Sequence, residues 1–322
     1  MFELTSKKIV VTGGGGFLGS GVVKELQKEG VRDIIIPRSR EFDLREKEVC
    51  EKVVTGCDVL IHVAAHVGGI GLNQAHPGQL FYDNAAMGLH LLEAARQAGV
   101  KKTVIIGTAC VYPKYCPVPF HEEDLWAGYP DEITGVYGLS KKLLLVQAQA
   151  YRKEYGFNAI FLIPVNLYGP GDNFDADYGH VIPSLILRMF EAKKKRQNKF
   201  VVWGSGIATR EFLYVEDAAR GIVQALKQYD GGEPVNLGTG REISIKDLVL
   251  LLKKIFNYRG EIVWDETKPD GQPRRAVDVT RAKEWFDFTA QTNLEDGLTK
   301  TIAWYICKFK SEKLKVKSTI QK

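Results

Sequence analysis

The sequence lacks long hydrophobic runs. Its longest apolar segments are the length of a strand and are interrupted by polar residues, whereas a membrane-spanning helix needs about 20 apolar residues in succession. It also has no internal repeat, no low-complexity linker and no signal-peptide pattern at its N-terminus. We therefore expect a soluble protein with no membrane partner, of a size that forms one large or two modest domains.

Cysteine is scarce and shows no pairing pattern. The five cysteines stand at positions 50, 57, 110, 116 and 307, an odd number without a repeated short spacing. Disulfide frameworks and zinc sites usually show an even set or CxxC-like pairs. This pattern predicts free thiols in a reducing cytoplasm.

The body of the chain carries no excess of charge of either sign. The formal net charge is +5, and the last fifteen residues, with six lysines and one glutamate, account for all of it. A nucleic-acid-binding protein would carry its positive charge along one face of the fold, so we expect no nucleic-acid partner. The tail is expected to be a solvated, frayed end; the alternative is a partner-binding arm.

Short β-branched runs alternate with helical stretches through the first half of the chain. We expect strands at 8–12, 33–36, 58–63, 103–106 and 159–163, and helices near 18–29, 45–54, 84–99 and 137–156. Strands without polar alternation, separated by amphipathic helices, are typical of a parallel sheet covered on both faces. The pattern predicts an α/β fold, a Rossmann-type doubly wound parallel sheet with a smaller, interleaved α/β lobe.

The regular alternation loosens after about residue 165. Helices are expected near 181–192, 216–228, 245–256 and 294–307, with only short strands between them. The first domain should cover residues 1–165 and also about 215–240, the second lobe 166–307, and the basic flexible tail 308–322.

A glycine-rich stretch follows the first expected strand directly. In GGGGFLGS, residues 13–20, Gly13, Gly16 and Gly19 satisfy GxxGxxG, and Gly14 with the last two satisfies GxGxxG. Missing side chains let the backbone approach a pyrophosphate at the N-terminus of the next helix. Because the stretch lies between a strand and a helix, it predicts a dinucleotide site rather than a merely flexible turn.

Arginines follow the second expected strand, where an acidic residue would favour NAD. Residues 37–40 read Pro, Arg, Ser, Arg. Guanidinium groups bind phosphate oxygens bidentately, so Arg38 and Arg40 favour the 2′-phosphate of NADP. The alternative is that both are solvated loop charges.

Tyr137 and Lys141 form a YxxxK pair at the start of a long expected helix. Four residues apart, they share one face of that helix. A phenol with a pKa near 10 is a weak acid-base group at neutral pH, and an adjacent ammonium is expected to lower that pKa. Thr108, at the end of the fourth expected strand, completes a combination suited to proton transfer at a carbonyl.

These features together resemble the extended short-chain dehydrogenase/reductase family, whose members act on nucleotide sugars. The resemblance covers about residues 7–305 and is strongest to the members that epimerise and then reduce a GDP-4-keto-6-deoxy sugar. It is carried by residues 64–73 (AAHVGGIGLN), 109–114 (ACVYPK), 166–174 (NLYGPGDNF), 180–185 (HVIPSL), 201–217 (VVWGSGIATREFLYVED) and 268–281 (KPDGQPRRAVDVTR).

The resemblance implies the catalytic residues. Thr108, in place of the more usual serine, would be the hydroxyl beside the substrate carbonyl, with Tyr137 as acid-base group and Lys141 as its tuning partner. Cys110 and His180 would exchange protons at C3 and C5, which the neighbouring C4 carbonyl acidifies. Tyr137 would hold the enolate oxygen and protonate it when NADPH reduces C4, which gives GDP-L-fucose from GDP-4-keto-6-deoxy-D-mannose. The alternatives are a small buried hydrophobe for Cys110 and a capping or packing role for His180.

The resemblance also implies the binding residues and the assembly. The expected NADP contacts are Gly13, Gly16, Phe17, Leu18, Gly19, Arg38, Arg40, Asp43, Ala64, Lys141, Pro164, Asn166, Leu167 and His180. The expected GDP-sugar contacts are Arg188, Trp203, Arg210 and Asp278. Plain alternatives are the polar face of a helix for Arg188, the core of the second lobe for Trp203 and a surface ion pair for Arg210. A homodimer through helices of the first domain is implied.

Several rival interpretations remain. His62 and His66 lie on a strand and its exit, where their spacing does not converge, so no metal site is expected. Cys116 matches nothing in the family pattern.

The alternative functions differ in the residues that they require. A nucleotide-sugar dehydratase would carry Asp-Glu where Ala109 and Cys110 stand. A nucleotide-sugar 4-epimerase, a 4-ketoreductase acting for example on a GDP-deoxyheptose, and a non-catalytic NADP sensor are the alternative functions.

Overall fold

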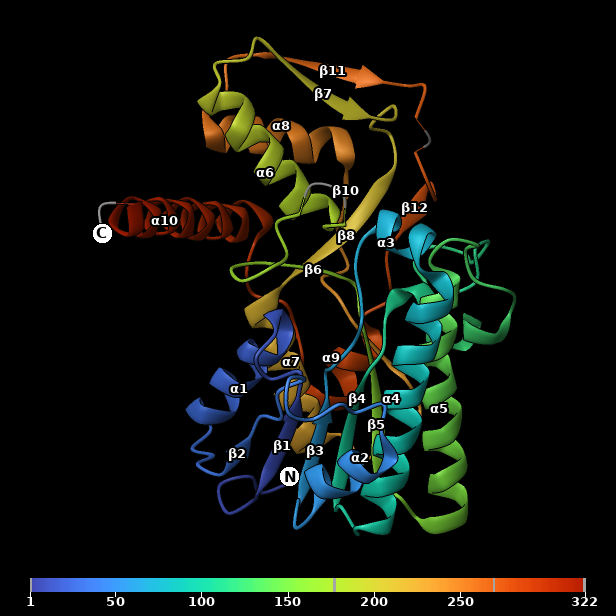
Figure 1. Cartoon of the computed structure of the whole chain (residues 1–322). Coiled ribbons are helices and arrows are strands. Elements are labelled where there is room, and N and C mark those ends of the chain that lie inside the picture. Colours follow the sequence, from blue (N-terminus) through green and yellow to red (C-terminus); the bar gives the residue numbers. More distant parts are fainter. Residues whose placement is uncertain (1, 176–177, 269, 321–322) are drawn as a thin grey trace.

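A six-stranded parallel sheet forms the core of the first domain (Figure 1). The computed structural model describes residues 2–175, 178–268 and 270–320. The strands, in the spatial order β2-β1-β3-β4-β5-β9, are β2 Ile34–Ile35, β1 Ile9–Thr12, β3 Val59–His62, β4 Lys102–Ile106, β5 Ala159–Pro164 and β9 Val235–Leu237. The five strands expected from the sequence are confirmed, and every pair is parallel. Strands β1, β3, β4 and β5 are buried along their whole length, which explains their apolar sequences.

Helices pack in two groups around this sheet. Helix α1 (Phe17–Lys28) packs on α7 (Val215–Gln228), whereas α4 (Pro77–Gln97) packs on both α2 (Lys47–Val54) and α5 (Gly135–Tyr155). Shorter elements are α3 Ile70–Ala75, α9 Thr280–Phe286 and the 3₁₀ helices Ala109–Val111 and Glu122–Trp126. The doubly wound α/β fold predicted from the sequence is confirmed.

The second lobe has its own sheet and its own core. A sheet ordered β10-β8-β12, with β6 paired to β8, and a two-stranded sheet of β7 and β11 pack with three helices (Figure 1). Its elements are β6 Asn166–Tyr168, α6 Val181–Lys194, β7 Lys199–Trp203, β8 Thr209–Tyr214, β10 Glu242–Ser244, α8 Ile245–Phe256, β11 Glu261–Asp265, β12 Arg274–Arg275 and α10 Leu294–Ile320.

The two lobes are interleaved along the chain. After β8 the polypeptide returns to the first core through α7 and β9, and it returns again with Ala282 and Phe286 of α9. Glu211 of β8, which is fully buried, accepts hydrogen bonds from the backbone N–H of Gly240 (2.8 Å) and Val277 (2.9 Å). These bonds fix the strands of the second lobe relative to the edge of the central sheet.

Helix α10 includes most of the expected basic tail. It runs to Ile320, and residues 321–322 lie outside the described residues. The flexibility expected for residues 308–322 stays a prediction. Within the described ranges, no helix combines the length and the apolar character that crossing a membrane requires.

Candidate active site

The glycine loop between β1 and α1 is too closely packed for side chains. Gly13 has a φ of +70°, and a Cβ there would lie 2.7 Å from the backbone nitrogen of Ala64. A Cβ on Gly19 would collide with the carbonyl oxygen of Gly13. No side chain caps α1, which begins after Gly16, so the positive end of the helix faces the loop. The loop therefore fits a pyrophosphate.

This loop lies at the topological switch point of the sheet. Strand β1 pairs with β2 on one side and with β3 on the other, and Gly13 touches Ala64 just beyond β3. Open parallel sheets bind dinucleotides at this position, beyond the carboxyl ends of their strands. The other expected NADP contacts with hydrophobic or amide side chains follow the same edge: Phe17 and Leu18 in the first turn of α1, Pro164 at the end of β5, and Asn166 and Leu167 in β6.

Arg38 and Arg40 are placed differently. A Cβ on Gly15 would collide with the Nη1 atom of Arg38, so this guanidinium lies directly on the glycine loop. Arg40 is exposed. Asp43 accepts hydrogen bonds from Arg45 (Nε to Oδ1, 2.9 Å), which lower the pKa of Asp43 to about 2. Arg38 is therefore the better placed of the two arginines for a 2′-phosphate.

Thr108, Cys110 and Tyr137 meet beyond the carboxyl end of β4. The hydroxyl of Thr108 accepts a hydrogen bond from the backbone nitrogen of Cys110 (3.2 Å) and begins the 3₁₀ helix Ala109–Val111. On α5, a Cβ on Gly138 would collide with the carbonyl oxygen of Cys110. This close approach sets Tyr137, the residue before Gly138, beside the cysteine. Cys110 keeps part of its surface open to solvent.

Tyr137 and Lys141 are both buried, and burial decides their ionisation. Burial lowers the pKa of Lys141 from 10.5 to about 8. Burial, followed by the negative charge that Cys110 can carry, raises the pKa of Tyr137 above its usual value of 10.0. The lowering of the Tyr137 pKa by Lys141 that the sequence predicts is therefore not found in this structure. Desolvation of the phenolate is the larger effect here.

His180 lies where the loop before α6 packs on the segment after β3. The backbone nitrogen of Gly69 donates to the carbonyl oxygen of Tyr178 (2.7 Å), and a Cβ on Gly69 would collide with the oxygen of Gly179. The carbonyl of His180 accepts from Ser184 (3.0 Å), so its backbone caps α6. Its imidazole is 44% exposed and remains accessible.

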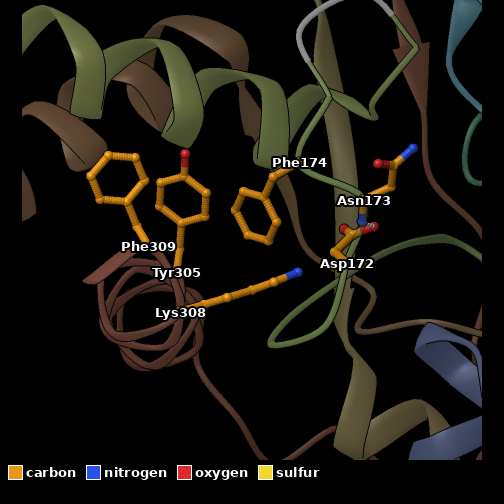
Figure 2. A pocket seen from close by; sticks show the side chains of 6 residues that line it. All are labelled: Asp172, Asn173, Phe174, Tyr305, Lys308 and Phe309. Atoms are coloured by element: carbon orange, nitrogen blue, oxygen red, sulfur yellow. Dashed lines mark hydrogen bonds between the residues drawn. The ribbon is translucent and has the colours of Figure 1, made fainter. Parts of the chain in front are cut away.

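Asp172 stands next to His180 and was not singled out in the sequence. Its Oδ1 lies 3.9 Å from the His180 Nδ1, and its Oδ2 is buried without a hydrogen-bond partner. It also lines a cavity of about 250 Å³ together with Asn173, Phe174, Tyr305, Lys308 and Phe309 (Figure 2). Figure 2 shows Lys308 of α10 pointing toward Asp172. The cavity adjoins the acid beside His180.

Three of the four expected sugar-nucleotide residues lie in the second lobe. Arg188 donates to the carbonyl oxygen of Val201, and its guanidinium lies 5.3 Å from the ring of Phe200. Trp203 is 66% exposed, so it is not part of the lobe core. Arg210 is half-buried, and its Nη1 donates to the carbonyl oxygen of Thr209 (2.7 Å) rather than to a carboxylate. Burial and then neighbouring Arg275 lower its pKa to about 10.

Asp278 is placed apart from these three. Its carboxylate accepts from the backbone nitrogen of Thr280 at the start of α9 (2.9 Å). Its own backbone nitrogen donates to the carbonyl of Phe120, which belongs to the first core. Among the described residues, no hydrogen bond or ion pair joins Asp278 to Arg188, Trp203 or Arg210.

Comparison with known proteins places this fold and site in a family. Residues 9–238 match the NAD dependent epimerase/dehydratase family. The chain is 37% identical to GDP-L-fucose synthase 1 of Arabidopsis thaliana over 303 residues, 94% of each chain. It is 37% identical to GDP-L-fucose synthase of Sinorhizobium fredii over 308 residues, 95% of this chain and 98% of that one. The crystal structure of a GDP-L-fucose synthetase from Naegleria fowleri bound to NADP superposes with a TM-score of 0.86 at 29% identity, covering 96% of this chain and 97% of that one.

The chain belongs to the NAD dependent epimerase/dehydratase family. The resemblance read from the sequence is thus confirmed. Within this epimerase/dehydratase chain, Ala109 and Cys110 follow Thr108, at the positions where the dehydratase alternative requires two acids.

Three other cysteines and two histidines of this epimerase/dehydratase chain are held by burial or by a hydrogen bond. Burial raises the pKa of Cys50 to about 12, of Cys57 to about 11 and of Cys116 to about 12. His62 is fully buried with its Nδ1 2.9 Å from the Thr12 hydroxyl, and His66 pairs with Asp83 (2.8 Å). Across the ranges given above, no group of His, Cys, Asp and Glu could hold a metal ion.

One further side chain reaches the site without having been assigned a role from the sequence. Arg275 of β12 places its Nη1 atom 3.6 Å from the Cys110 Sγ. The signal was present, because Arg275 lies within residues 268–281, one of the stretches that carry the resemblance to the family. Asp172 likewise lies within residues 166–174.

Proposed function

We propose that this protein is an NADPH-dependent epimerase-reductase that converts GDP-4-keto-6-deoxy-D-mannose to GDP-L-fucose. The observation that carries the proposal is the position of Cys110, partly exposed between Thr108 and the helix of Tyr137. A plain 4-epimerase or 4-ketoreductase has no chemical need for a thiol at the carbonyl site. Relatives named GDP-L-fucose synthase match over nearly the whole chain, which supports the same assignment.

The glycine loop and Arg38 would hold NADPH. The loop N–H groups and the positive end of α1 suit the pyrophosphate, and Arg38 on Gly15 suits the 2′-phosphate. Lys141 and the loop containing His180 would border the nicotinamide end. Bound NADPH would supply the hydride for C4.

Epimerisation would depend on Cys110 and His180. A C4 carbonyl acidifies the hydrogens at C3 and C5, and inversion requires one group to remove a proton and another to return one on the opposite face. Cys110 extends from the end of β4 and His180 from the N-terminus of α6, so the two groups come from different lobes. A sugar ring held between the lobes would present one face to each.

Tyr137 would serve as proton donor. Because burial raises its pKa, the phenol is protonated at neutral pH, as a donor to the enolate oxygen and to the C4 alkoxide must be. Thr108 would hold the same oxygen from the other side. The basic and aromatic surface of Arg188, Trp203 and Arg210 would bind the GDP portion, with Asp278 as a further contact.

We further propose a homodimer in the cytoplasm. Helices α4 and α5 pack together and expose Tyr82 (63%), Phe81 (41%), Leu89 (36%) and Val146 (47%). Exposed apolar side chains on two adjacent long helices suit burial against a second copy. The free cysteines suit a reducing compartment.

The direct test is consumption of NADPH, followed by absorbance, when the purified protein meets GDP-4-keto-6-deoxy-mannose. We expect stoichiometric loss of NADPH, and Cys110→Ser should lower the rate of product formation by about 100-fold, as removal of an acid-base group typically does. Cys307→Ser, which changes an exposed cysteine on α10, is the matched control and should keep full activity. Absence of NADPH consumption by the wild-type protein would refute the proposal.

A further inference from the structure

Arg275 and Cys110 meet across the two lobes. The Nη1 atom of Arg275 donates to the Cys110 Sγ at 3.6 Å, although 165 positions separate the two residues in sequence. This distance is ordinary for a hydrogen bond to sulfur, which is larger than oxygen. The contact places the permanent positive charge of Arg275 beside the Cys110 sulfur, the group that we propose moves protons at the sugar ring.

Two hydrogen bonds to Gln272 hold the Arg275 guanidinium in place. Its Nε (3.1 Å) and Nη2 (2.9 Å) both donate to the side-chain oxygen of Gln272. The amide nitrogen of Gln272 donates to the carbonyl of Lys114, four residues after Cys110 (3.0 Å). The loop that carries the thiol therefore also anchors the arginine, and Nη1 is left directed at the sulfur.

The surroundings of the sulfur are positively charged. Arg275 stands opposite Arg210 in the register of β12 with β8, and its charge adds to burial in lowering the pKa of Arg210. Asp270 is the acidic group that interacts with Arg210 there. Thiolates are stabilised beside cationic side chains in partly exposed sites.

We propose that Arg275, fixed by Gln272, is a positioning residue that stabilises the anionic sulfur of Cys110 for proton abstraction. This deepens, and rests on, the proposed epimerase-reductase function. In the step, the thiolate forms an S–H bond with a hydrogen on the carbon beside C4. The C–H bond breaks, its electron pair enters the enolate, and the enolate oxygen takes up the negative charge that the sulfur loses. His180 then donates a proton to the opposite face of the same carbon, which forms a new C–H bond and restores the C4 carbonyl.

The test measures Cys110 itself and requires no substrate. The thiolate is the nucleophile toward iodoacetamide, so alkylation of the Cys110 peptide, followed by mass spectrometry in the NADPH-bound protein, reports the anionic sulfur. Arg275→Ala should slow alkylation by about 10-fold or more, since a neighbouring cation is lost. Added guanidinium ion at non-denaturing concentration should restore part of the alkylation rate in Arg275→Ala. The alkylation rate of Arg275→Lys should lie between those of the wild type and Arg275→Ala.

Matched controls separate charge from structure. Arg274→Ala removes the exposed side chain of the preceding residue in β12, which pairs with Glu242. In this variant, Cys110 should be alkylated at the wild-type rate. Cys307 alkylation in the same sample is the internal reference. An unchanged or faster Cys110 rate in Arg275→Ala, or no response to guanidinium ion, would overturn the inference.

A second measurement distinguishes this inference from the proposed function. With substrate in heavy water, Arg275→Ala should slow deuterium incorporation next to the carbonyl more than it raises the KM for the sugar nucleotide. If the wild-type protein incorporates no deuterium, the proposed function fails, while the alkylation rates still decide whether Arg275 acts on Cys110.

Discussion

At the scale of single residues, burial governs the ionisation of Tyr137 and Lys141, the pair to which we assign a catalytic role. The pKa of the phenol is raised and that of the ammonium is lowered, so each neutral form is favoured. The sequence showed the pair and its shared helix face. It could not show the desolvation, because that depends on residues packed around α5 from distant parts of the chain.

The lowered pKa of Lys141 makes a prediction about stability. A lysine whose pKa falls from 10.5 to about 8 on folding destabilises the folded state below pH 8, where the buried amine must carry a charge. This cost is relieved as the pH rises from about 8 to 10.5. At pH 7 the cofactor-free Lys141→Met variant should therefore be more stable than the wild type, by about 2 kcal/mol. Urea unfolding at pH 7 and pH 10 measures this, and the difference should shrink at pH 10.

The control is Lys153→Met, an exposed position on the same helix. It should change the free energy of unfolding by less than about 0.5 kcal/mol at either pH. A Lys141→Met variant that is less stable than the wild type at pH 7 would contradict the account of its burial.

At the scale of elements, the glycine loop and the arginine after β2 form one unit. The loop is close-packed against Ala64 and against Arg38, whose Nη1 takes the space that a Cβ on Gly15 would need. Only glycine fits at these positions, because a Cβ would collide with the neighbouring atoms. The glycine pattern between a strand and a helix therefore predicted the loop conformation from the sequence.

Cofactor preference follows from Arg38. Arg38→Ala should weaken NADPH binding by about 10- to 100-fold, because a charged hydrogen bond to phosphate contributes about 1.5–3 kcal/mol. NADH binding should change little, since NADH has no 2′-phosphate. Fluorescence titration of both nucleotides checks this, with Arg32→Ala, an exposed arginine before β2, as the control. Equal weakening of both nucleotides would contradict a role at the 2′-phosphate.

The sequence predicted the regular elements better than their arrangement. Strands β1, β3, β4 and β5 were found because buried parallel strands are continuous apolar runs. Strand β9, three residues long, was not assigned, since its place at the sheet edge depends on pairing with β5. The same reason applies to Arg275, whose contact with Cys110 exists only once β12 has joined β8.

At the scale of the whole molecule, the chain crosses between its lobes several times. Glu211, Gly240 and Val277 link the second lobe to the edge of the central sheet. Cys110 lies just after β4 of the first domain, and His180 lies at the start of α6 in the second lobe. The site can therefore form only in the complete fold.

Assembly gives a prediction at this scale. Tyr82→Arg combined with Leu89→Glu places charges on the exposed face of α4 and should convert a dimer to a monomer in analytical ultracentrifugation. Leu250→Glu, a similarly exposed change on α8 of the second lobe, is the control and should leave the dimer intact. An unchanged mass for the double variant would show that this face is not the interface.

The central claim is that one site both epimerises and reduces the sugar. It is tested most directly by running the reaction in heavy water with NADPH and GDP-4-keto-6-deoxy-mannose and locating deuterium in the product by NMR. The account predicts deuterium at both C3 and C5 of a product reduced at C4, and loss of that label with Cys110→Ser. A product reduced at C4 without deuterium at either carbon would contradict it.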